Sequence, residues 1–558
     1  MNTSKPWLEQ YSHGIPADID PSTYSSLNTM FDDIVANYAT RNVVEYMGKM
    51  MSYRALDQMS NQICNFIQSL GLQKGDRVAI MLPNVFQYQI AMVGILKAGC
   101  VVVNVNPQYT ARELEYQLND SGASALIILE NFAHVYASIQ AKTQIKQVVV
   151  TSLGELIGLK GIVVDFVVRH VKKMVPTWNI ANSINFKKAL TIGSKKMFHP
   201  TSVEPTDIAF LQYTGGTTGV SKGAVLTHKN IIANVLQIEA WLEPVLKENK
   251  FGQQLSFLCA LPLYHIFALT ACGFLCMRKG GIALFVPNPK DIPGFIQFLK
   301  KHPKIHIFPA VNTLFNALMN HPQFSQVKLP ELLATVGGGM AVQKVVAEKW
   351  KNLMGKPIIE GYGLTETSPV ACINLALNQD YTGNVGLPVS STEVVILDDD
   401  GLEVPYGSPG EICIRGPQVM AGYWNKPEET VKTMTSDGYF KSGDIGIMDE
   451  HGFTKIIDRK KDMILVSGFN VYPNELEDVI ANHPGVLECA VIGVPDDNSG
   501  EVVKVFIVKK DPLLTEAMVN QFCKENFTNY KRPKYIEFRS ELPKSNVGKI
   551  LRRQLRPH

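Results

Sequence analysis

Short apolar runs alternate with amphipathic stretches along most of the first 380 residues. RVAIML (77–82), CVVVNV (100–105) and DIAFLQY (207–213) are typical runs, and helix-like stretches such as residues 86–98 lie between them. Near-continuous apolar strands that alternate with helices are typical of parallel sheets covered on both faces. Because there are too many such strands for one sheet of ordinary size, the pattern predicts an α/β domain with two packed, doubly wound sheets.

The pattern changes toward the C-terminus. From about residue 383 to 457, short strands are separated by Gly and Asp turns with little helix, which favours a small β subdomain. Five charged residues follow in a row at 458–462, and a separate set of strands and helices comes after them. We therefore expect an N-terminal domain at 1–457, a hinge at 458–462 and a small, mobile α+β C-terminal domain at 463–558.

The composition narrows the class of protein. A chain of 558 residues with 46% hydrophobic and 19% charged residues is typical of a globular protein rather than of a disordered chain. A net charge of +3 gives no support for nucleic-acid binding. The nine cysteines include no C-x-x-C pair, and the N-terminus has no apolar signal segment, so we expect reduced thiols and a cytoplasmic location.

Two segments raise the question of membrane contact. Residues 255–277 contain no charged side chain and are long enough to cross a bilayer. Pro262 near their middle favours a buried strand followed by a buried helix instead. Residues 156–176 mix apolar side chains with Lys, Arg and His, as interfacial helices do, although an ordinary surface helix or an inserted hairpin fits slightly better. Peripheral contact with the cytoplasmic face of the inner membrane therefore stays open.

The segment YTGGTTGVSKG, from Tyr213 to Gly223, directly continues an apolar strand. Its glycines allow a tight turn with inward N–H groups, its hydroxyls add donors, and Lys222 adds a full charge, which together suit a polyphosphate. The segment does not fit the Walker A pattern. Residues 219–223 match the G-x-S-x-G motif of hydrolases, but no strand ends directly before them, so we do not expect Ser221 to be a nucleophile.

Further motifs offer groups that suit a nucleotide, although each would also fit an ordinary turn. In GYGLTE (361–366), Tyr362 offers a ring for a purine, Thr365 a hydroxyl for phosphate, and Glu366 a hard oxygen for Mg²⁺. Asp444 could accept hydrogen bonds from both hydroxyls of a ribose. Arg459 presents a charged fork that suits ribose and phosphate oxygens.

A run of three glycines, one histidine and one lysine are further candidate site residues. Gly337, Gly338 and Gly339 follow an apolar strand and would let the backbone approach a ligand closely. His265 ends another apolar run, where a core histidine is the usual interpretation. Lys549 lies in a basic C-terminal tail whose other cations, Lys544, Arg552 and Arg553, we expect to be solvated.

Seven motifs together resemble, in order, the signatures of the adenylate-forming superfamily. They are YTGGTTGVSKG (213–223), LPLYH (261–265), VGGGM (336–340), GYGLTE (361–366), GYFKSGDIG (438–446), DRKKDMILVSGFNVYPNELE (458–477) and PKSNVGKILRR (543–553). The resemblance covers nearly the whole chain and is strongest to bacterial long-chain fatty-acid–CoA ligases. It implies that a fatty acid is activated to acyl-CoA through an acyl-adenylate, with Mg²⁺ as cofactor and ATP and coenzyme A as co-substrates.

The resemblance also implies residue roles. It assigns ATP binding to Tyr213, Thr214, Gly215, Gly216, Thr217, Thr218, Gly219, Lys222, Gly338, Gly339, Glu360, Tyr362, Asp444 and Arg459. It assigns catalysis to Lys549, Glu366, Thr365 and His265, with Glu366 as the metal ligand and Lys549 as the bridge between the carboxylate and the α-phosphate. His265 and Gly337 would border the acyl pocket. Lys461 would be the hinge pivot, and Gly468 would line the passage of the coenzyme A pantetheine.

Three alternatives stay open. An acyl-AMP ligase that loads a carrier protein shares the first half-reaction, but the insertion typical of that branch is not seen between Lys461 and Tyr472. A non-catalytic lipid-binding relative would have lost Glu366 or Lys549, and both are present. A luciferase-like oxygenase shares the motifs and is disfavoured only by residues 436–462. The sequence does not determine the preferred acyl length or the oligomeric state.

Overall fold

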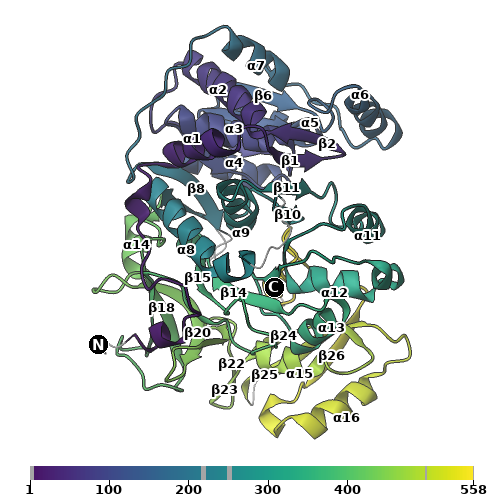
Figure 1. The fold of residues 1–558 in the computed structure, drawn as a ribbon. Coiled ribbons are helices and arrows are strands. Elements are labelled where there is room, and N and C mark those ends of the chain that lie inside the picture. The colour runs from purple at the N-terminus through teal and green to yellow at the C-terminus, as the bar shows by residue number, and fades with distance from the viewer. Residues whose placement is uncertain (1–4, 215–220, 248–253, 497–498, 557–558) are drawn as a thin grey trace.

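The computed structural model describes residues 5–214, 221–247, 254–496 and 499–556, and its fold is drawn in Figure 1. Two large sheets build the N-terminal part, as the apolar runs predict. The first sheet is parallel from β14 to β1 and has antiparallel strands at both edges. In spatial order it contains β16 (Leu387–Pro388), β15 (Val370–Ile373), β14 (Ile358–Gly363), β13 (Ala334–Gly337), β12 (Ile307–Ala310), β10 (Ser256–Cys259), β11 (Ile282–Phe285), β1 (Asn42–Tyr46) and β2 (Lys49–Ser52).

The second sheet is parallel from β8 to β7, and an antiparallel pair extends it beyond β8. In spatial order it contains β19 (Gly422–Tyr423), β9 (Lys222–Thr227), β8 (Ile208–Thr214), β4 (Val101–Asn104), β3 (Arg77–Met81), β5 (Ala125–Leu129), β6 (Gln147–Thr151) and β7 (Ile184–Asn185).

Helices cover the sheets and contribute to their shared core. They include α1 (Leu27–Tyr38), α2 (Tyr53–Ser69), α3 (Phe86–Lys97), α4 (Ala111–Ser121), α5 (Glu130–Ala137), α6 (Leu159–Phe166), α7 (Phe186–Ser194), α8 (His228–Leu246), α11 (Ile292–Lys301), α12 (Asn312–Asn320) and α13 (Lys344–Met354). Every residue of α3 is buried. One hydrophobic cluster joins Ile90 of this helix to Val102 of the second sheet and Phe257 of the first. The two sheets are therefore packed into one domain.

The apolar segment 255–277 is part of this core. It forms β10 and then a buried helical stretch made of α9 (Ile266–Ala268), the π-helix η5 (Leu269–Leu275) and α10 (Cys276–Arg278). This confirms the buried strand and helix. In the parts of the chain that the structure describes, no helix is long and apolar enough to cross a membrane. All nine cysteines are buried and free, as expected for reduced thiols.

A four-stranded antiparallel sheet forms the predicted β subdomain. Its strands, in order, are β17 (Glu393–Leu397), β18 (Gly410–Arg415), β20 (Phe440–Met448) and β21 (Thr454–Arg459), and α14 (Pro427–Lys432) lies between β18 and β20 in the chain. Asp458 and Arg459 still pair with β20. The chain therefore leaves this sheet only after Arg459, inside the run of charges.

The C-terminal part is a smaller α+β unit with a hydrophobic cluster of its own. It contains β22 (Ile464–Val466), β23 (Phe469–Val471), α15 (Pro473–Ile480), β24 (Val486–Asp496), β25 (Gly500–Lys509), α16 (Glu516–Asn526) and β26 (Tyr535–Arg539). It lies beside α12 and α13 (Figure 1), where Thr313 donates a hydrogen bond to the Gly548 carbonyl at 2.8 Å and Asn316 donates one to the Leu487 carbonyl at 3.0 Å. The predicted fold class is confirmed.

Candidate active site

A large cleft of about 1660 Å³ is lined by both the N-terminal and the C-terminal parts of the chain. The predicted site residues that line it are Tyr213, Thr214, Lys222, His265, Gly337, Gly338, Gly339, Glu360, Tyr362, Thr365, Glu366, Asp444, Arg459, Lys461 and Lys549. Gly215, Gly216, Thr217, Thr218 and Gly219 lie outside the described residues. Motifs spread over more than 300 residues of sequence thus face one space.

Sheet topology explains how the N-terminal motifs meet. The carboxyl ends of neighbouring parallel strands lie at one edge of a sheet, which is where ligands of open α/β sheets bind. Gly337 is the last residue of β13, and Tyr362 lies near the end of β14 beside it. In the second sheet, Thr214 ends β8 and pairs in register with Lys222, the first residue of β9.

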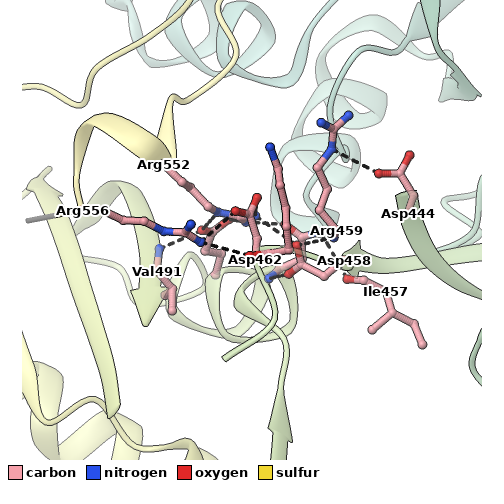
Figure 2. A network of polar contacts seen from close by, with 11 residues as sticks. Asp444, Ile457, Asp458, Arg459, Asp462, Val491, Arg552 and Arg556 are labelled. Carbon is pink, nitrogen blue, oxygen red and sulfur yellow. Dashed lines mark hydrogen bonds and ion pairs between the residues drawn. The ribbon is translucent and has the colours of Figure 1, made fainter. Parts of the chain in front are cut away.

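Asp444 and Arg459 face each other on the antiparallel strands β20 and β21. The Arg459 Nε lies 3.1 Å from Asp444 Oδ1, and the Tyr362 hydroxyl donates to Asp444 Oδ2 at 2.7 Å. Figure 2 shows the Arg459 side chain directed toward Asp444. The Asp444 carboxylate is buried and held from two sides, so its orientation in the cleft is set before any ligand binds.

Lys549 reaches the cleft from the C-terminal tail. Its backbone is anchored because Lys549 N donates to Ser545 Oγ at 3.1 Å and the preceding Gly548 carbonyl accepts from Thr313. Burial, assisted by the positive charge of Arg459, lowers the pKa of Lys549 to about 8, while Asp444 opposes this change. The ammonium group is therefore charged at neutral pH but close to its titration range.

His265 caps the helical stretch that follows β10, where its Nδ1 accepts from Phe267 N at 3.4 Å. Burial, with a smaller contribution from the charge of Lys549, lowers the pKa of His265 to about 4. The imidazole is therefore neutral at pH 7. It can donate or accept a hydrogen bond at the border of the cleft without adding charge.

Glu366 is a buried carboxylate at the start of the turn that follows β14. The Tyr423 hydroxyl donates to its Oε1 at 2.7 Å, and burial raises the pKa of Glu366 despite this hydrogen bond. No three His, Cys, Asp or Glu side chains gather into a metal site in the described parts of the chain. A single carboxylate suits Mg²⁺, which usually binds one or two carboxylates and takes its other ligands from phosphates and water.

Two of the glycines of VGGGM, Gly337 and Gly338, leave little room for a side chain on the cleft wall. A Cβ atom on Gly337 would lie 2.7 Å from both Ile358 and Val342, and one on Gly338 would lie 3.2 Å from the Phe267 ring. Gly339 has a φ of +77°, which side chains rarely adopt. Beside them, burial raises the pKa of Glu360 to about 8, although its Oε1 accepts from Val342 N at 3.1 Å.

Part of the cleft wall is apolar. The side chains that line it come from α8, β10, η5 and β12, and they are Ile238, Leu242, Phe257, Ala271, Leu275 and Ile307. All of them except Ala271 are buried. A wall of aliphatic and aromatic groups in the same cleft as Lys549 and His265 suits the hydrocarbon part of a substrate.

We expected the cations of the C-terminal tail other than Lys549 to be solvated, and for Arg552 this expectation is wrong. Its side chain is only 14% exposed, because it contacts Asp458 at 3.1 Å, Glu477 at 2.8 Å and Asp462 at 3.7 Å. Lys544 also has a partner, Glu488 at 2.6 Å. Figure 2 shows the Arg552 side chain directed into this group of carboxylates, with Arg556 beside Asp462. Arg552 is held by three carboxylates, and none of them is near it in the sequence.

Sequence reasoning missed Tyr423 and Glu429. These residues contact Lys222, the predicted phosphate ligand, and Tyr423 also contacts Glu366, the predicted metal ligand. Tyr423 binds Glu366, and its ring lies 5.1 Å from the Lys222 ammonium group. Glu429 of α14 forms an ion pair with Lys222. The seven motifs contain no signal for either residue, because residues 422–432 read as an ordinary strand, turn and short helix.

Among the predicted site residues that the structure describes, Gly468 is the one that does not line the cleft. It lies in the exposed turn between β22 and β23 with a φ of +85°, and a Cβ atom there would meet nothing within 4 Å. Lys461 follows β21 directly after Lys460, and its carbonyl accepts from Arg556 Nη2 at 3.4 Å. The roles of both residues in a second domain arrangement stay predictions.

Comparison with known proteins agrees with this geometry. Residues 31–424 match the family described as AMP-binding enzyme, and residues 475–549 match its C-terminal domain. The chain is 51% identical to a long-chain-fatty-acid–CoA ligase of Escherichia coli O6:H1 and 52% identical to one of Yersinia pestis, and each alignment covers 99% of this chain and 98% of the relative. A crystal structure of an anthranilate CoA ligase with bound anthranoyl-AMP superposes with a TM-score of 0.83 at 25% identity, covering 96% of this chain and 98% of that one.

The chain therefore belongs to the AMP-binding enzyme family, the adenylate-forming superfamily that its motifs resemble.

Proposed function

We propose that this protein is a ligase that activates long-chain fatty acids to acyl-CoA with ATP, through an acyl-adenylate. The position of Lys549 carries the proposal, because it lines the same cleft as Asp444 and Glu366 and that cleft has an apolar wall. The names of the full-length relatives from Escherichia coli and Yersinia pestis support the acyl class and the thiol acceptor.

In the first half-reaction, the fatty carboxylate attacks the α-phosphorus of ATP. A carboxylate O–P bond forms, and the bond between the α-phosphorus and the bridging oxygen breaks to release pyrophosphate. Two anions must meet, so the Lys549 ammonium group would lie between them and offset the charge that gathers in the transition state. Asp444 and Arg459 would hold the ribose, which orients the α-phosphate for attack in line.

Lys222 and the hydroxyl of Thr365 would bind phosphate oxygens at the other end of the nucleotide. Glu366 would hold Mg²⁺, which offsets phosphate charge when bound. Glu366 accepts a hydrogen bond from Tyr423, so its carboxylate is already oriented toward the cleft. This supports a binding mode in which the ion reaches the protein through one carboxylate.

In the second half-reaction, the thiol sulfur of coenzyme A attacks the acyl carbon, the C–O bond to AMP breaks, and AMP leaves as its anion. The thiol proton goes to solvent or to the departing phosphate. No protein nucleophile takes part. We infer that the C-terminal domain, residues 463–558, turns about Lys461 between the two steps and that Gly468 then reaches the cleft. Asp458 and Arg459 belong to β21, so the hinge predicted at 458–462 would begin only after Arg459.

One assay tests the function and separates its alternatives. ATP–pyrophosphate exchange is measured over a panel of C6–C20 fatty acids, with and without coenzyme A, and the thioester is quantified. We expect exchange without coenzyme A and thioester with it, both highest for long chains. Exchange with no thioester would favour an acyl-AMP ligase that loads a carrier protein. No exchange with any acid would favour a non-catalytic lipid-binding relative.

We further propose a cytoplasmic protein that touches the inner membrane through α6, the π-helix η4 (Val167–Val171) that continues it, and the two lysines after η4. Leu159 is 84%, Ile162 68% and Phe166 58% exposed, and Lys172 and Lys173 follow as exposed cations. An apolar face beside cations suits an anionic lipid surface. Such contact would be weak and sensitive to salt, since few charges take part.

A further inference from the structure

Lys222 lines the cleft, but its ammonium group is bound by a carboxylate that does not. Glu429 forms an ion pair with it, although the two residues are 207 positions apart. The Lys222 side chain is 17% exposed and the Glu429 side chain 32%. The charge of Lys222, the predicted phosphate ligand, is therefore already balanced by the Glu429 carboxylate.

Glu429 is held in place by the fold. β19 pairs with β9, so Tyr423 lies opposite Ala224, and Trp424 N donates to the Gly223 carbonyl at 2.8 Å. The short helix α14 is joined to this strand because Tyr423 N donates to Thr430 Oγ1 at 2.9 Å. A carboxylate on such an anchored helix has little freedom to leave the neighbourhood of Lys222.

Glu429 also has a second cation. The Lys432 ammonium group lies 3.0 Å from Glu429 Oε1, while Lys222 binds Oε2. These two hydrogen bonds lower the pKa of Glu429 to about 2, so the carboxylate is ionised at neutral pH. If Lys222 turns away, Glu429 keeps one cation and need not be protonated.

We propose that Glu429 competes with the ATP polyphosphate, and with product pyrophosphate, for Lys222. The Glu429 carboxylate binds the Lys222 ammonium group when the phosphate site is empty. Phosphate oxygens must then displace this carboxylate or share the ammonium group with it. Glu429 therefore weakens the binding of both ligands and favours release of pyrophosphate after adenylate formation. This inference rests on the proposed role of Lys222.

The test compares Glu429→Gln with the wild-type protein at low ionic strength. Glutamine keeps the shape and an acceptor but removes the charge. We expect pyrophosphate, with Mg²⁺ present, to bind about two- to fivefold more tightly, the range that partly exposed ion pairs contribute. The KM for ATP should fall by a similar factor, and both effects should shrink in high salt.

Two controls isolate the Lys222 contact. Glu428→Gln removes the same charge from the adjacent, exposed position of α14 and should leave pyrophosphate binding near the wild-type value. In a Lys222→Met background, Glu429→Gln should lose its effect, because the pair no longer exists.

Unchanged or weaker pyrophosphate binding in Glu429→Gln would overturn the inference, since a residue that only positions Lys222 gives weaker binding when it is removed. Tighter binding that persists in the Lys222→Met background would overturn it too, because general repulsion would then be the cause. Failure of the wild-type protein to bind ATP or pyrophosphate at all would instead count against the proposed function.

Discussion

The Arg552 guanidinium group lies 3.1 Å from the carboxylate of Asp458, whose side chain is fully buried. Asp458 belongs to β21 in the N-terminal part, whereas Arg552 follows Lys549 by three residues in the C-terminal tail. Asp458 Oδ2 also accepts from Asn474 N at 2.7 Å, at the start of α15. β21, the last strand of the β subdomain, is thus tied to the segment that carries Lys549.

Removing this cation should affect the arrangement of the two domains. In Arg552→Met, Asp458 and Glu477 lose a buried partner, and breaking a buried pair costs about 3–5 kcal/mol. We expect a lower melting temperature and slower adenylate formation. Lys544→Met is the matched control, because the pair of Lys544 with Glu488 is more exposed and worth about 1 kcal/mol or less. Equal effects of the two variants would mean that the Arg552 cluster has no special role.

Lys549→Ala should separate the two half-reactions. Loss of a charged donor aimed at the transition state should slow adenylate formation by about 10²–10³-fold. Thioester formation from synthetic acyl-adenylate and coenzyme A should stay near the wild-type rate if Lys549 leaves the cleft before the thiol attacks. Loss of both steps in a folded variant would give Lys549 a different role, and loss of neither would place the catalytic lysine elsewhere.

The pH dependence of adenylation should report Lys549. Its pKa of about 8 lies below the usual value for lysine, so the free enzyme loses this proton as the pH rises through about 8. The kcat/KM for adenylation, which follows the free enzyme, should therefore fall above that pH. Lys549→Arg should keep part of the activity and move the alkaline limb to higher pH, because guanidinium does not titrate there. An unmoved limb would assign the titration to another group.

Gly468→Leu should leave adenylation close to normal and impair thioester formation. In the described arrangement Gly468 lies outside the cleft with free space around it, so a side chain disturbs nothing near Lys549, although its φ of +85° adds local strain. Lys461→Pro should act alike by restricting the turn after β21. Separate assays of the two half-reactions check this, and equal loss of both would argue against domain rotation.

Membrane contact should depend on α6 and the cations after it. Co-sedimentation with anionic vesicles at low salt should decrease when Lys172 and Lys173 are both changed to Gln, at about 1 kcal/mol per basic residue near the surface. Ile162→Ser with Phe166→Ser should decrease it further. Leu513→Ser, at a side chain 79% exposed in the C-terminal part, is the control. Binding that no variant changes would leave α6 an ordinary surface helix.

Much of the fold follows from the sequence alone. Apolar runs such as residues 100–105 form strands that are buried on both faces, because helices cover both faces of a parallel sheet and exclude water from its inner strands. The motifs also indicated which residues line one cleft, since Gly337 ends β13 and Tyr362 lies near the end of the neighbouring parallel strand β14. These features are local or periodic, so they can be read along the chain.

Only the tertiary structure decided which charges pair. Arg552 looked like a solvated tail residue, yet it meets Asp458 and Glu477, which are 94 and 75 positions away. The sequence indicated that Lys222 is free to bind phosphate, yet it is paired with Glu429, which lies 207 positions later in the chain. Electrostatic attraction and burial depend on distance through space, and neither the period of apolar residues nor the spacing of motifs encodes that distance between remote charges.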